Sequence, residues 1–239
     1  MRAQAYSYRG GELDLFSQAK NWKAYFARCL RPYIGGDVAE IGAGIGSTTL
    51  ALLNPDVASW LCIEPDPGLA KIIERKLTQE KLSAHCRVMS GFLDGLSPSE
   101  SFDTILYVDV LEHIQADRDE VQRAYARLRP GGRLIVLAPA FGMLFSAFDR
   151  AVGHFRRYTV DQLRSLTPSN ATVIRVGYLD SAGFLLSLGN RLLVRASMPK
   201  PAQIKLWDTV IVPISRTIDP VVARYFGRSA VIVWRRPLG

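Results

Sequence analysis

Short apolar segments alternate with amphipathic ones between residues 37 and 140, and this alternation restricts the possible folds more than any other feature of the chain. Parallel strands need a long crossover, usually a helix, between one strand and the next. Two further strand patterns follow, at 171–179 and 229–237. We therefore predict an α/β fold: a Rossmann-like, seven-stranded, mostly parallel sheet with helices on both faces and a helical insertion before the last strand.

The helical patterns have clear expected ends. Apolar residues at helical spacing predict one helix from Leu13 to Leu30, and Pro130 is expected to end a helix that starts at Asp117. We expect a single domain over 1–239. Its expected regions are a helical lead-in (1–36), a cofactor-binding core (37–140), an acceptor-side segment with the sixth strand (141–182), a basic helical insertion (183–228) and the last strand (229–239).

The composition excludes several classes of protein. Hydrophobic residues make up 48% of the 239 residues and charged residues 22%, which are ordinary values for a globular chain. The three cysteines are scattered without a CxxC pair, which favours a reducing cytosol over a disulfide framework or a zinc site. The first residues lack the apolar run of a signal peptide, and no stretch approaches a membrane span. We expect a cytoplasmic protein.

A glycine-rich turn follows the first strand, from Glu40 to Gly46. Glycines at such a turn let the backbone approach a ligand closely. The third glycine arrives one residue earlier than in the dinucleotide fingerprint G-x-G-x-x-G, so the turn alone does not identify the nucleotide. Glu64 closes the second strand, where a carboxylate can accept hydrogen bonds from both hydroxyls of a ribose. The alternative for Glu64 is a solvated acid at a strand end.

Five segments in order resemble the motifs of class I S-adenosylmethionine-dependent methyltransferases. They are VAEIGAGIGS, CIEPD, GFLDGL, FDTILYVDVLEHI and LRPGGRLIVLAP, and together they cover about residues 37–139. The resemblance implies a Rossmann-like fold, S-adenosyl-L-methionine as cofactor and S-adenosyl-L-homocysteine as product.

The resemblance also implies a role for each matching residue. The glycines would line the methionine and ribose, Glu40 would lie near the amino group, Glu64 would hold the ribose, two residues would flank the adenine, and an acid would lie where sulfonium and acceptor meet. The glycines are Gly42, Gly44 and Gly46. The residues that would flank the adenine are Phe92 and Leu93, and the acid between sulfonium and acceptor is Asp109. The family often has an acid at the position of Phe92, and Asp94 is the neighbouring acid that could replace it.

Two histidines are candidates for the acceptor side. His113 follows the fourth strand, and a structural role in shaping its loop is as reasonable as catalysis. His154 belongs to a cluster just after the fifth strand, at the edge where open α/β sheets bind ligands; a solvated charged loop is the alternative. The other cluster members are Asp149, Arg156, Arg157 and Tyr158.

This cluster resembles the GHxRRY segment of a bacterial subset of methyltransferases associated with cell-surface glycans, lipids and natural products. In that interpretation His154 orients or deprotonates the acceptor as a catalytic residue, and an arginine binds an anionic group of the substrate. No spacing of acids and histidines suggests a metal site.

The positive charge is concentrated near the C-terminus. From Gly183 to Gly239, nine lysines and arginines stand against Asp208 and Asp219. We consider a helical lid over the pocket and a peripheral contact with an anionic membrane, and these are compatible. Nucleic-acid binding is disfavoured, because aliphatic residues dilute the basic ones and no stacking platform is evident.

These features predict a methyltransferase that acts on a small-molecule or lipid- or glycan-linked acceptor, with oxygen favoured over nitrogen and carbon. Two rivals remain at this point. One is a nicotinamide-dependent dehydrogenase, against which the early third glycine and the later motifs argue. The other is a cofactor-binding scaffold without catalysis, because the glycine turn and Glu64 indicate only a capacity to bind.

Overall fold

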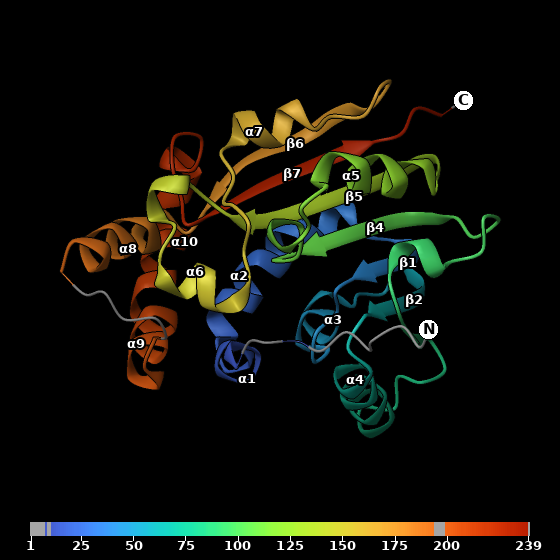
Figure 1. Ribbon diagram of the computed structural model, residues 1–239, viewed down its shortest axis with the longest axis horizontal. Coiled ribbons are helices and arrows are strands. Elements are labelled where there is room, and N and C mark those ends of the chain that lie inside the picture. The colour runs from blue at the N-terminus through green and yellow to red at the C-terminus, as the bar shows by residue number, and fades with distance from the viewer. Residues whose placement is uncertain (1–7, 9–10, 194–198, 239) are drawn as a thin grey trace.

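A seven-stranded sheet in the order β3-β2-β1-β4-β5-β7-β6 forms the centre of the computed structural model (Figure 1). The structure describes residues 8, 11–193 and 199–238, without the side chains of 190–193, so parts of the predicted lead-in and insertion lie outside the described residues. β7 runs antiparallel to β5 and β6, and the other pairs are parallel. The strands are β1 (Gly36–Ile41), β2 (Val57–Glu64), β3 (Cys86–Ser90), β4 (Phe102–Val108), β5 (Leu128–Pro139), β6 (Thr172–Leu179) and β7 (Ser229–Arg235). The predicted fold class is confirmed.

Helices connect the strands as the alternation predicts. The α-helices are α1 (Glu12–Ser17), α2 (Lys20–Leu30), α3 (Ser47–Leu52), α4 (Pro67–Gln79), α5 (Asp117–Ala126), α6 (Ala147–Val152), α7 (Val160–Ser165), α8 (Ser181–Leu193), α9 (Pro201–Leu206) and α10 (Val212–Val222). Short helical turns are η1 (Arg31–Tyr33), η2 (Leu93–Gly95), η3 (Leu111–His113) and η4 (Gly142–Leu144), and a π-helical turn, η5 (Trp207–Ile211), joins α9 to α10. Among the described residues, no helix is long and apolar enough to cross a membrane.

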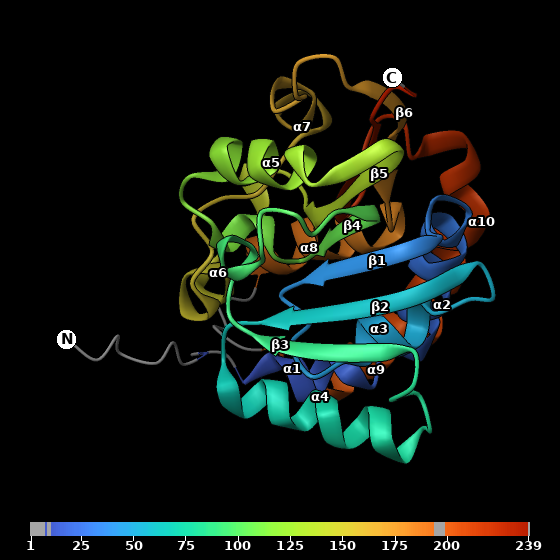
Figure 2. The same ribbon diagram turned by 90° about the vertical axis from the view of Figure 1, so that its right-hand side faces the viewer.

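The sheet is covered on both faces (Figure 2). α2, α3, α4, α9 and α10 contribute to the core on one face, and α5 and α7 contribute to the core on the other. Neighbouring residues of a strand point to opposite faces, so a central strand must be apolar throughout. In β4, Leu106 belongs to the first core and Ile105 to the second, and both are fully buried.

Two buried aspartates fasten the insertion to α2. The Asp219 carboxylate accepts a hydrogen bond from the Tyr25 hydroxyl at 2.5 Å and another from the backbone N–H of Asp180 at 2.7 Å. Asp208 accepts a hydrogen bond from the backbone N–H of Trp22 at 2.8 Å. These are the acids of the basic insertion, and each is only 5% exposed. Its acidic side chains therefore hold the fold together, while Lys200, Lys205, Arg216 and Arg224 are exposed on its outside.

Two predicted helix boundaries are wrong. The expected helix from Leu13 to Leu30 is two helices, α1 and α2, because the Lys23 ammonium donates hydrogen bonds to the carbonyls of Phe16 and Ser17 at 2.7 Å and so satisfies the exposed end of α1. The helix from Asp117 ends at Ala126 rather than at Pro130, which lies in β5. The strand tolerates this proline because its pairing with β4 is irregular there and skips it.

Candidate active site

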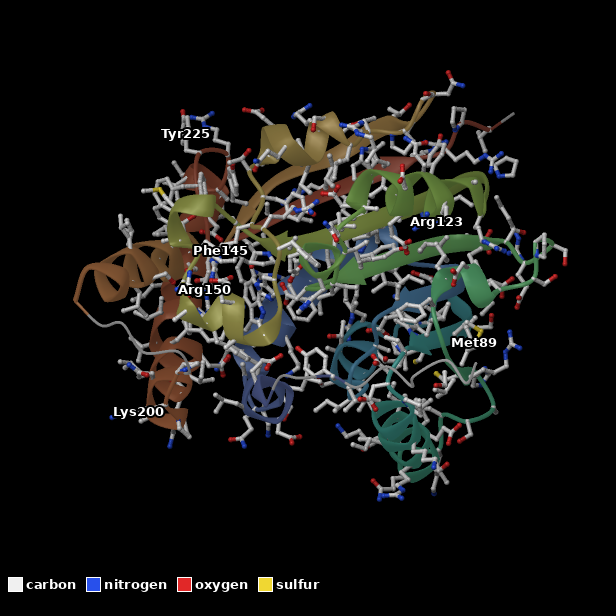
Figure 3. The ribbon with its side chains drawn as sticks, viewed as in Figure 1. Met89, Arg123, Phe145, Arg150, Lys200 and Tyr225 are labelled. Atoms are coloured by element: carbon white, nitrogen blue, oxygen red, sulfur yellow. The ribbon has the colours of Figure 1, made fainter. Side chains whose placement is uncertain are left out.

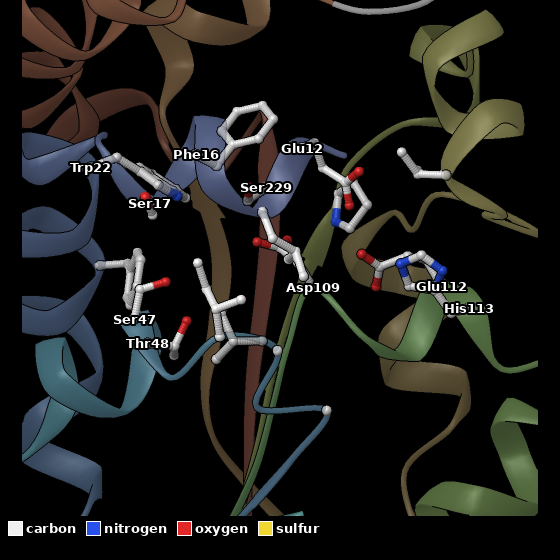
Figure 4. Close-up of a pocket in the computed structure, with 18 of the residues that line it drawn as sticks. Glu12, Phe16, Ser17, Trp22, Ser47, Thr48, Asp109, Glu112, His113 and Ser229 are labelled. Atoms are coloured by element: carbon white, nitrogen blue, oxygen red, sulfur yellow. The ribbon is translucent and has the colours of Figure 1, made fainter. Parts of the chain in front are cut away.

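A cavity of about 200 Å³ lies beyond the carboxyl ends of β1 and β4, where α/β sheets of this kind bind ligands. Distant segments line it: α1 and α2, the glycine loop after β1, the ends of β4 and β5, parts of 148–157, and Trp207 and Arg228 from the insertion. Figure 4 shows Asp109 near its centre, between the start of α3 on one side and η3 on the other.

The glycine loop has a backbone that requires glycine. Gly42, Gly44 and Gly46 have φ angles of 67°, 60° and 75°, in the left-handed region that side chains disfavour. A Cβ atom on Gly42 would lie 2.6 Å from a methyl carbon of Val110. Gly42 and Gly44 line the cavity, whereas Gly46 caps α3 and is not among the lining residues. A side chain would clash at Gly42 and would be strained by the φ angle at Gly44 and Gly46, so the loop backbone lies open to a ligand, which fits a bound nucleoside cofactor.

Glu64 holds the glycine loop in place. Its carboxylate accepts hydrogen bonds from the backbone N–H groups of Gly44 at 2.8 Å and Asp66 at 2.9 Å. It is 3% exposed, and burial raises its pKa. The described N-terminal residues lie over this region: Tyr8 donates its backbone N–H to Asp66, and Leu13 lies against Gly44. Glu64 therefore lies at the expected strand end but outside the cavity lining.

Three other predicted cofactor residues also lie outside the lining of the cavity. Glu40 is buried beneath the loop, where it accepts hydrogen bonds from Thr49 at 2.5 Å and Trp60 at 2.9 Å. Burial raises the pKa of Glu40 to about 7, although these hydrogen bonds oppose the shift. Phe92 is 54% exposed and Leu93 is buried. Glu40 thus stabilises the base of the loop in this structure.

Asp109 occupies the predicted position at the end of β4. Its φ of 54° is left-handed, which Asp tolerates better than most residues. Its accessible surface faces the cavity, and burial raises the pKa of its carboxyl although electrostatic interactions with His154 and Arg228 oppose the shift. An acid here can interact favourably with a sulfonium or with an acceptor.

His154 is held by a buried carboxylate. Its Nδ1 lies 2.8 Å from Asp149, which is fully buried and also accepts hydrogen bonds from two nitrogens of Arg157 at 2.8 and 3.0 Å. Burial alone would raise the pKa of Asp149, but the hydrogen bonds from His154 and Arg157 hold it well below its usual range. With Nδ1 engaged by Asp149, Nε2 is the nitrogen of His154 that remains for a ligand.

Two predicted substrate residues of the same cluster point elsewhere. Arg156 forms an ion pair with Asp117 at 2.5 Å, and the buried Tyr158 hydroxyl donates a hydrogen bond to the same carboxylate at 2.8 Å. Neither residue lines the cavity, whereas Arg157 lines it but is occupied by Asp149. Arg156 and Tyr158 thus fasten the segment to the start of α5.

His113 and Glu112 lie beside His154. The His113 and His154 rings meet edge to face, with centroids 4.5 Å apart, and burial lowers the pKa of His113 to about 4. Glu112 is fully buried, and neither of its carboxylate oxygens has a hydrogen-bond partner among the described residues. The sequence predicts no metal site, but the fold brings three groups of metal-ligating chemistry together here.

Arg228 is a cavity residue that the sequence does not single out. Its guanidinium lies over the ring of Trp207, 4.4 Å from the ring centroid, and 5.9 Å from that of Phe16. Within the described part of the chain, the guanidinium has no ion pair and no hydrogen bond, and burial lowers its pKa. Nothing local in the sequence distinguishes it from the other arginines of the insertion.

Comparisons with known proteins agree with the predicted enzyme class. Residues 39–134 match the family model of a methyltransferase domain. A demethylmenaquinone methyltransferase of Tropheryma whipplei is 28% identical over 169 residues, covering 70% of this chain and 67% of the relative. A ubiquinone biosynthesis O-methyltransferase of Paramagnetospirillum magneticum is 25% identical over 172 residues, covering 68% of this chain and 67% of the relative.

Solved structures share the fold. A putative sarcosine dimethylglycine methyltransferase of Galdieria sulphuraria superposes with a TM-score of 0.60 at 16% identity, covering 92% of this chain and 86% of the other. The cyclase SpnF superposes with a TM-score of 0.63 at 16% identity, covering all of this chain and 86% of the other. The family match and the relatives confirm the predicted enzyme class and cofactor.

Proposed function

We propose that this S-adenosylmethionine-dependent methyltransferase methylates a hydroxyl oxygen of a small acceptor that carries an anionic group. The observation that carries the proposal is one cavity lined both by His154, whose Nδ1 contacts the buried Asp149, and by Arg228, whose guanidinium has no ion pair among the described residues. His154 can accept a hydrogen bond from a hydroxyl, and the Arg228 guanidinium can bind a carboxylate or phosphate. The glycine loop on the opposite side supports a cofactor there.

S-adenosylmethionine, when bound, supplies a methyl group on a sulfonium sulfur. Gly42 and Gly44 would receive its methionine part, Glu64 the ribose hydroxyls, and Phe92 with Leu93 the adenine. Cofactor entry then requires Tyr8 and α1 to move from the face of Glu64, because these residues now lie over it. We infer that Tyr8 and α1, together with Trp207 of the insertion, close the cavity over bound ligands and exclude water.

His154 orients the acceptor hydroxyl and weakens its O–H bond. Asp149 fixes the imidazole by its contact with Nδ1, so the lone pair of Nε2 is available to the acceptor. Alignment of the oxygen with the methyl group gives most of the rate in a displacement at carbon, and removal of the proton adds to it. Asp109, near the centre of the cavity, lies where an acid can stabilise the positive sulfur.

Arg228 selects the acceptor by charge. Its guanidinium carbon lies over the rings of Trp207 and Phe16, and its N–H groups can donate hydrogen bonds to an anion. Two relatives carry names from quinone biosynthesis, and one is named an O-methyltransferase, which supports an oxygen on a small molecule. The GHxRRY segment supports an acceptor linked to a lipid or glycan.

The outer surface of the insertion supports contact with an anionic membrane. Large apolar side chains are exposed along α9, η5 and α10, among them Leu206 at 54% and Ile214 at 47%. The basic side chains Lys205 and Arg216, each within two residues of one of them, are also exposed. Figure 3 shows Lys200 and Tyr225 near opposite ends of this helical layer. An apolar face with interspersed basic residues is typical of helices that lie on anionic lipid.

Calorimetric titration with S-adenosylmethionine and S-adenosylhomocysteine tests the first half of the proposal, with micromolar binding expected. Hydroxylated carboxylic acids are then screened for methyl transfer, and the product is analysed for an O-methyl group. In this assay His154→Ala should reduce turnover at least about tenfold while cofactor affinity stays unchanged. His85→Ala, on the exposed loop before β3, is the control. Normal turnover by His154→Ala would refute the role of His154, and a folded protein that binds no cofactor would refute the proposal as a whole.

A further inference from the structure

Three side chains at one end of the cavity have the composition of a metal site. Glu112, His113 and His154 each offer one ligand atom, and these atoms all lie within 4.8 Å of one another. The carboxylate of Glu112 lies 3.8 Å from Nε2 of His154. Ligand atoms about 2.0–2.2 Å from one zinc ion lie at most about 4.4 Å apart. Small rotations of these side chains would therefore bring all three onto a single ion.

Glu112 provides a second, independent observation. It is fully buried, and neither of its oxygens has a hydrogen-bond partner in the described part of the chain. A buried carboxylate without a partner is strongly destabilising, so such groups in folded proteins are paired with a proton, a cation or a metal ion. The cavity-facing position of Glu112 makes it accessible to an ion from the cavity.

The two histidines are prepared to act as ligands. Asp149 accepts the contact from Nδ1 of His154 at 2.8 Å, which is the carboxylate–histidine arrangement that orients metal-bound imidazoles. The His113 ring meets the His154 ring edge to face, with centroids 4.5 Å apart, so both imidazoles lie at the same end of the cavity. No described lysine or arginine forms an ion pair with Glu112 that would compete with an ion.

We propose that Glu112, His113 and His154 bind one divalent transition-metal ion at the acceptor end of the cavity. Two imidazoles and one carboxylate suit zinc, manganese or iron rather than calcium. Because all three residues line the cavity, the ion keeps open positions toward the ligand space.

The role of the ion rests on the proposed function. An acceptor hydroxyl that binds at an open position loses its proton to the Asp109 carboxylate. Its oxygen then forms the bond to the methyl carbon while the carbon–sulfur bond breaks and S-adenosylhomocysteine leaves. With the ion bound, the Nε2 lone pair of His154 is a ligand, so His154 acts on the acceptor through the ion in place of direct contact with the hydroxyl, and Asp109 receives the proton.

Metal binding is tested first without cofactor or acceptor. The intact protein, stripped with a chelator, is titrated with Zn²⁺ by calorimetry and with Co²⁺ by visible absorption, and one ion per chain is expected. The chain has three histidines, so ring proton NMR of the wild type adds an independent readout. Zn²⁺ should shift the signals of two histidines and leave the third, His85, unchanged. A folded protein that takes up no ion, or an ion that shifts the His85 signal alone, would overturn the proposal.

Variants then identify the ligands. Glu112→Gln keeps the shape of the side chain and removes its charge, so Zn²⁺ should bind at least about tenfold more weakly in a protein with an unchanged circular dichroism spectrum. His85→Ala should bind as the wild type does. Equal affinity in Glu112→Gln would overturn the site. Methyl transfer that persists in metal-free protein would refute only the role of the ion. Failure of the wild-type protein to bind the cofactor would count against the proposed function.

Discussion

Two buried carboxylates next to the cavity, Asp149 and Glu112, differ in the hydrogen-bond donors that surround them. Asp149 is surrounded by donors from His154, Arg157 and Ser146, so its charge is fully compensated. Glu112, in the same region, has no such donor among the described residues. Asp149 is therefore expected to be structural and constant in charge, whereas the charge of Glu112 depends on what enters the cavity.

The carboxylate of Glu64 is expected to contribute to cofactor binding as well as to the shape of the loop. Glu64→Ala should weaken S-adenosylmethionine binding about tenfold or more, because hydrogen bonds to a charged group contribute roughly 1.5–3 kcal/mol. Calorimetric titration measures the change. Glu64→Gln keeps an acceptor for the N–H of Gly44 and separates the two effects, and Glu74→Ala on the exposed side of α4 is the control. Equal affinity for S-adenosylmethionine in Glu64→Ala, Glu64→Gln and Glu74→Ala would show that Glu64 has no role in cofactor binding.

The guanidinium of Arg228 is expected to determine the affinity for the acceptor. Arg228→Met keeps an unbranched side chain against Trp207 and removes the charge. The KM of an anionic acceptor should rise about tenfold or more, while S-adenosylmethionine affinity is unchanged. Steady-state kinetics with an anionic acceptor and its neutral ester measure the effect, which should be absent for the ester. Arg164→Met, on exposed α7, is the control, and an unchanged KM for the anion would refute the assignment.

At the scale of elements, the insertion depends on a few buried polar contacts. Asp219→Ala would leave the Tyr25 hydroxyl and the N–H groups of Asp180 and Ser181 without their acceptor. We expect the free energy of unfolding to fall by at least about 2 kcal/mol, because each buried donor without a partner costs roughly 1–3 kcal/mol. Urea denaturation measures it. Asp161→Ala, an exposed acid of α7, should change stability by only a few tenths of a kcal/mol. Equal stability of the two variants would contradict this role.

At the scale of the whole molecule, the buried acids leave a basic, apolar outer surface on the insertion. Sedimentation with anionic phosphatidylglycerol vesicles should exceed that with neutral phosphatidylcholine vesicles and should weaken with salt. Leu206→Ser with Ile214→Ser should reduce vesicle binding about tenfold or more, because two exposed aliphatic side chains lose their burial in lipid. Leu238→Ser, which removes a more exposed side chain (67%) beyond the opposite end of β7, should have no effect. Equal sedimentation with both lipids would refute the membrane contact.

The sequence by itself determined the order of strands and helices, the glycine loop and the acid after β2. These features are local: an apolar strand, a left-handed backbone that only Gly42 and its neighbours adopt easily, and a helix start all depend on adjacent residues. The helix break before Lys20 was missed, because a side chain from the next helix satisfies the end of α1.

Only the tertiary structure decided which residues share the cavity. Glu112 and His154 follow different strands, and Arg228 stands at the end of the insertion, yet the sheet brings all three to one edge. The same packing turned Arg156 and Tyr158 toward Asp117 and buried Glu40 beneath the loop. Proximity of this kind arises from the packing of distant elements, which leaves no local pattern, and so Glu112 and Arg228 could not be assigned to this cavity from the sequence alone, although Asp109 and His154 could.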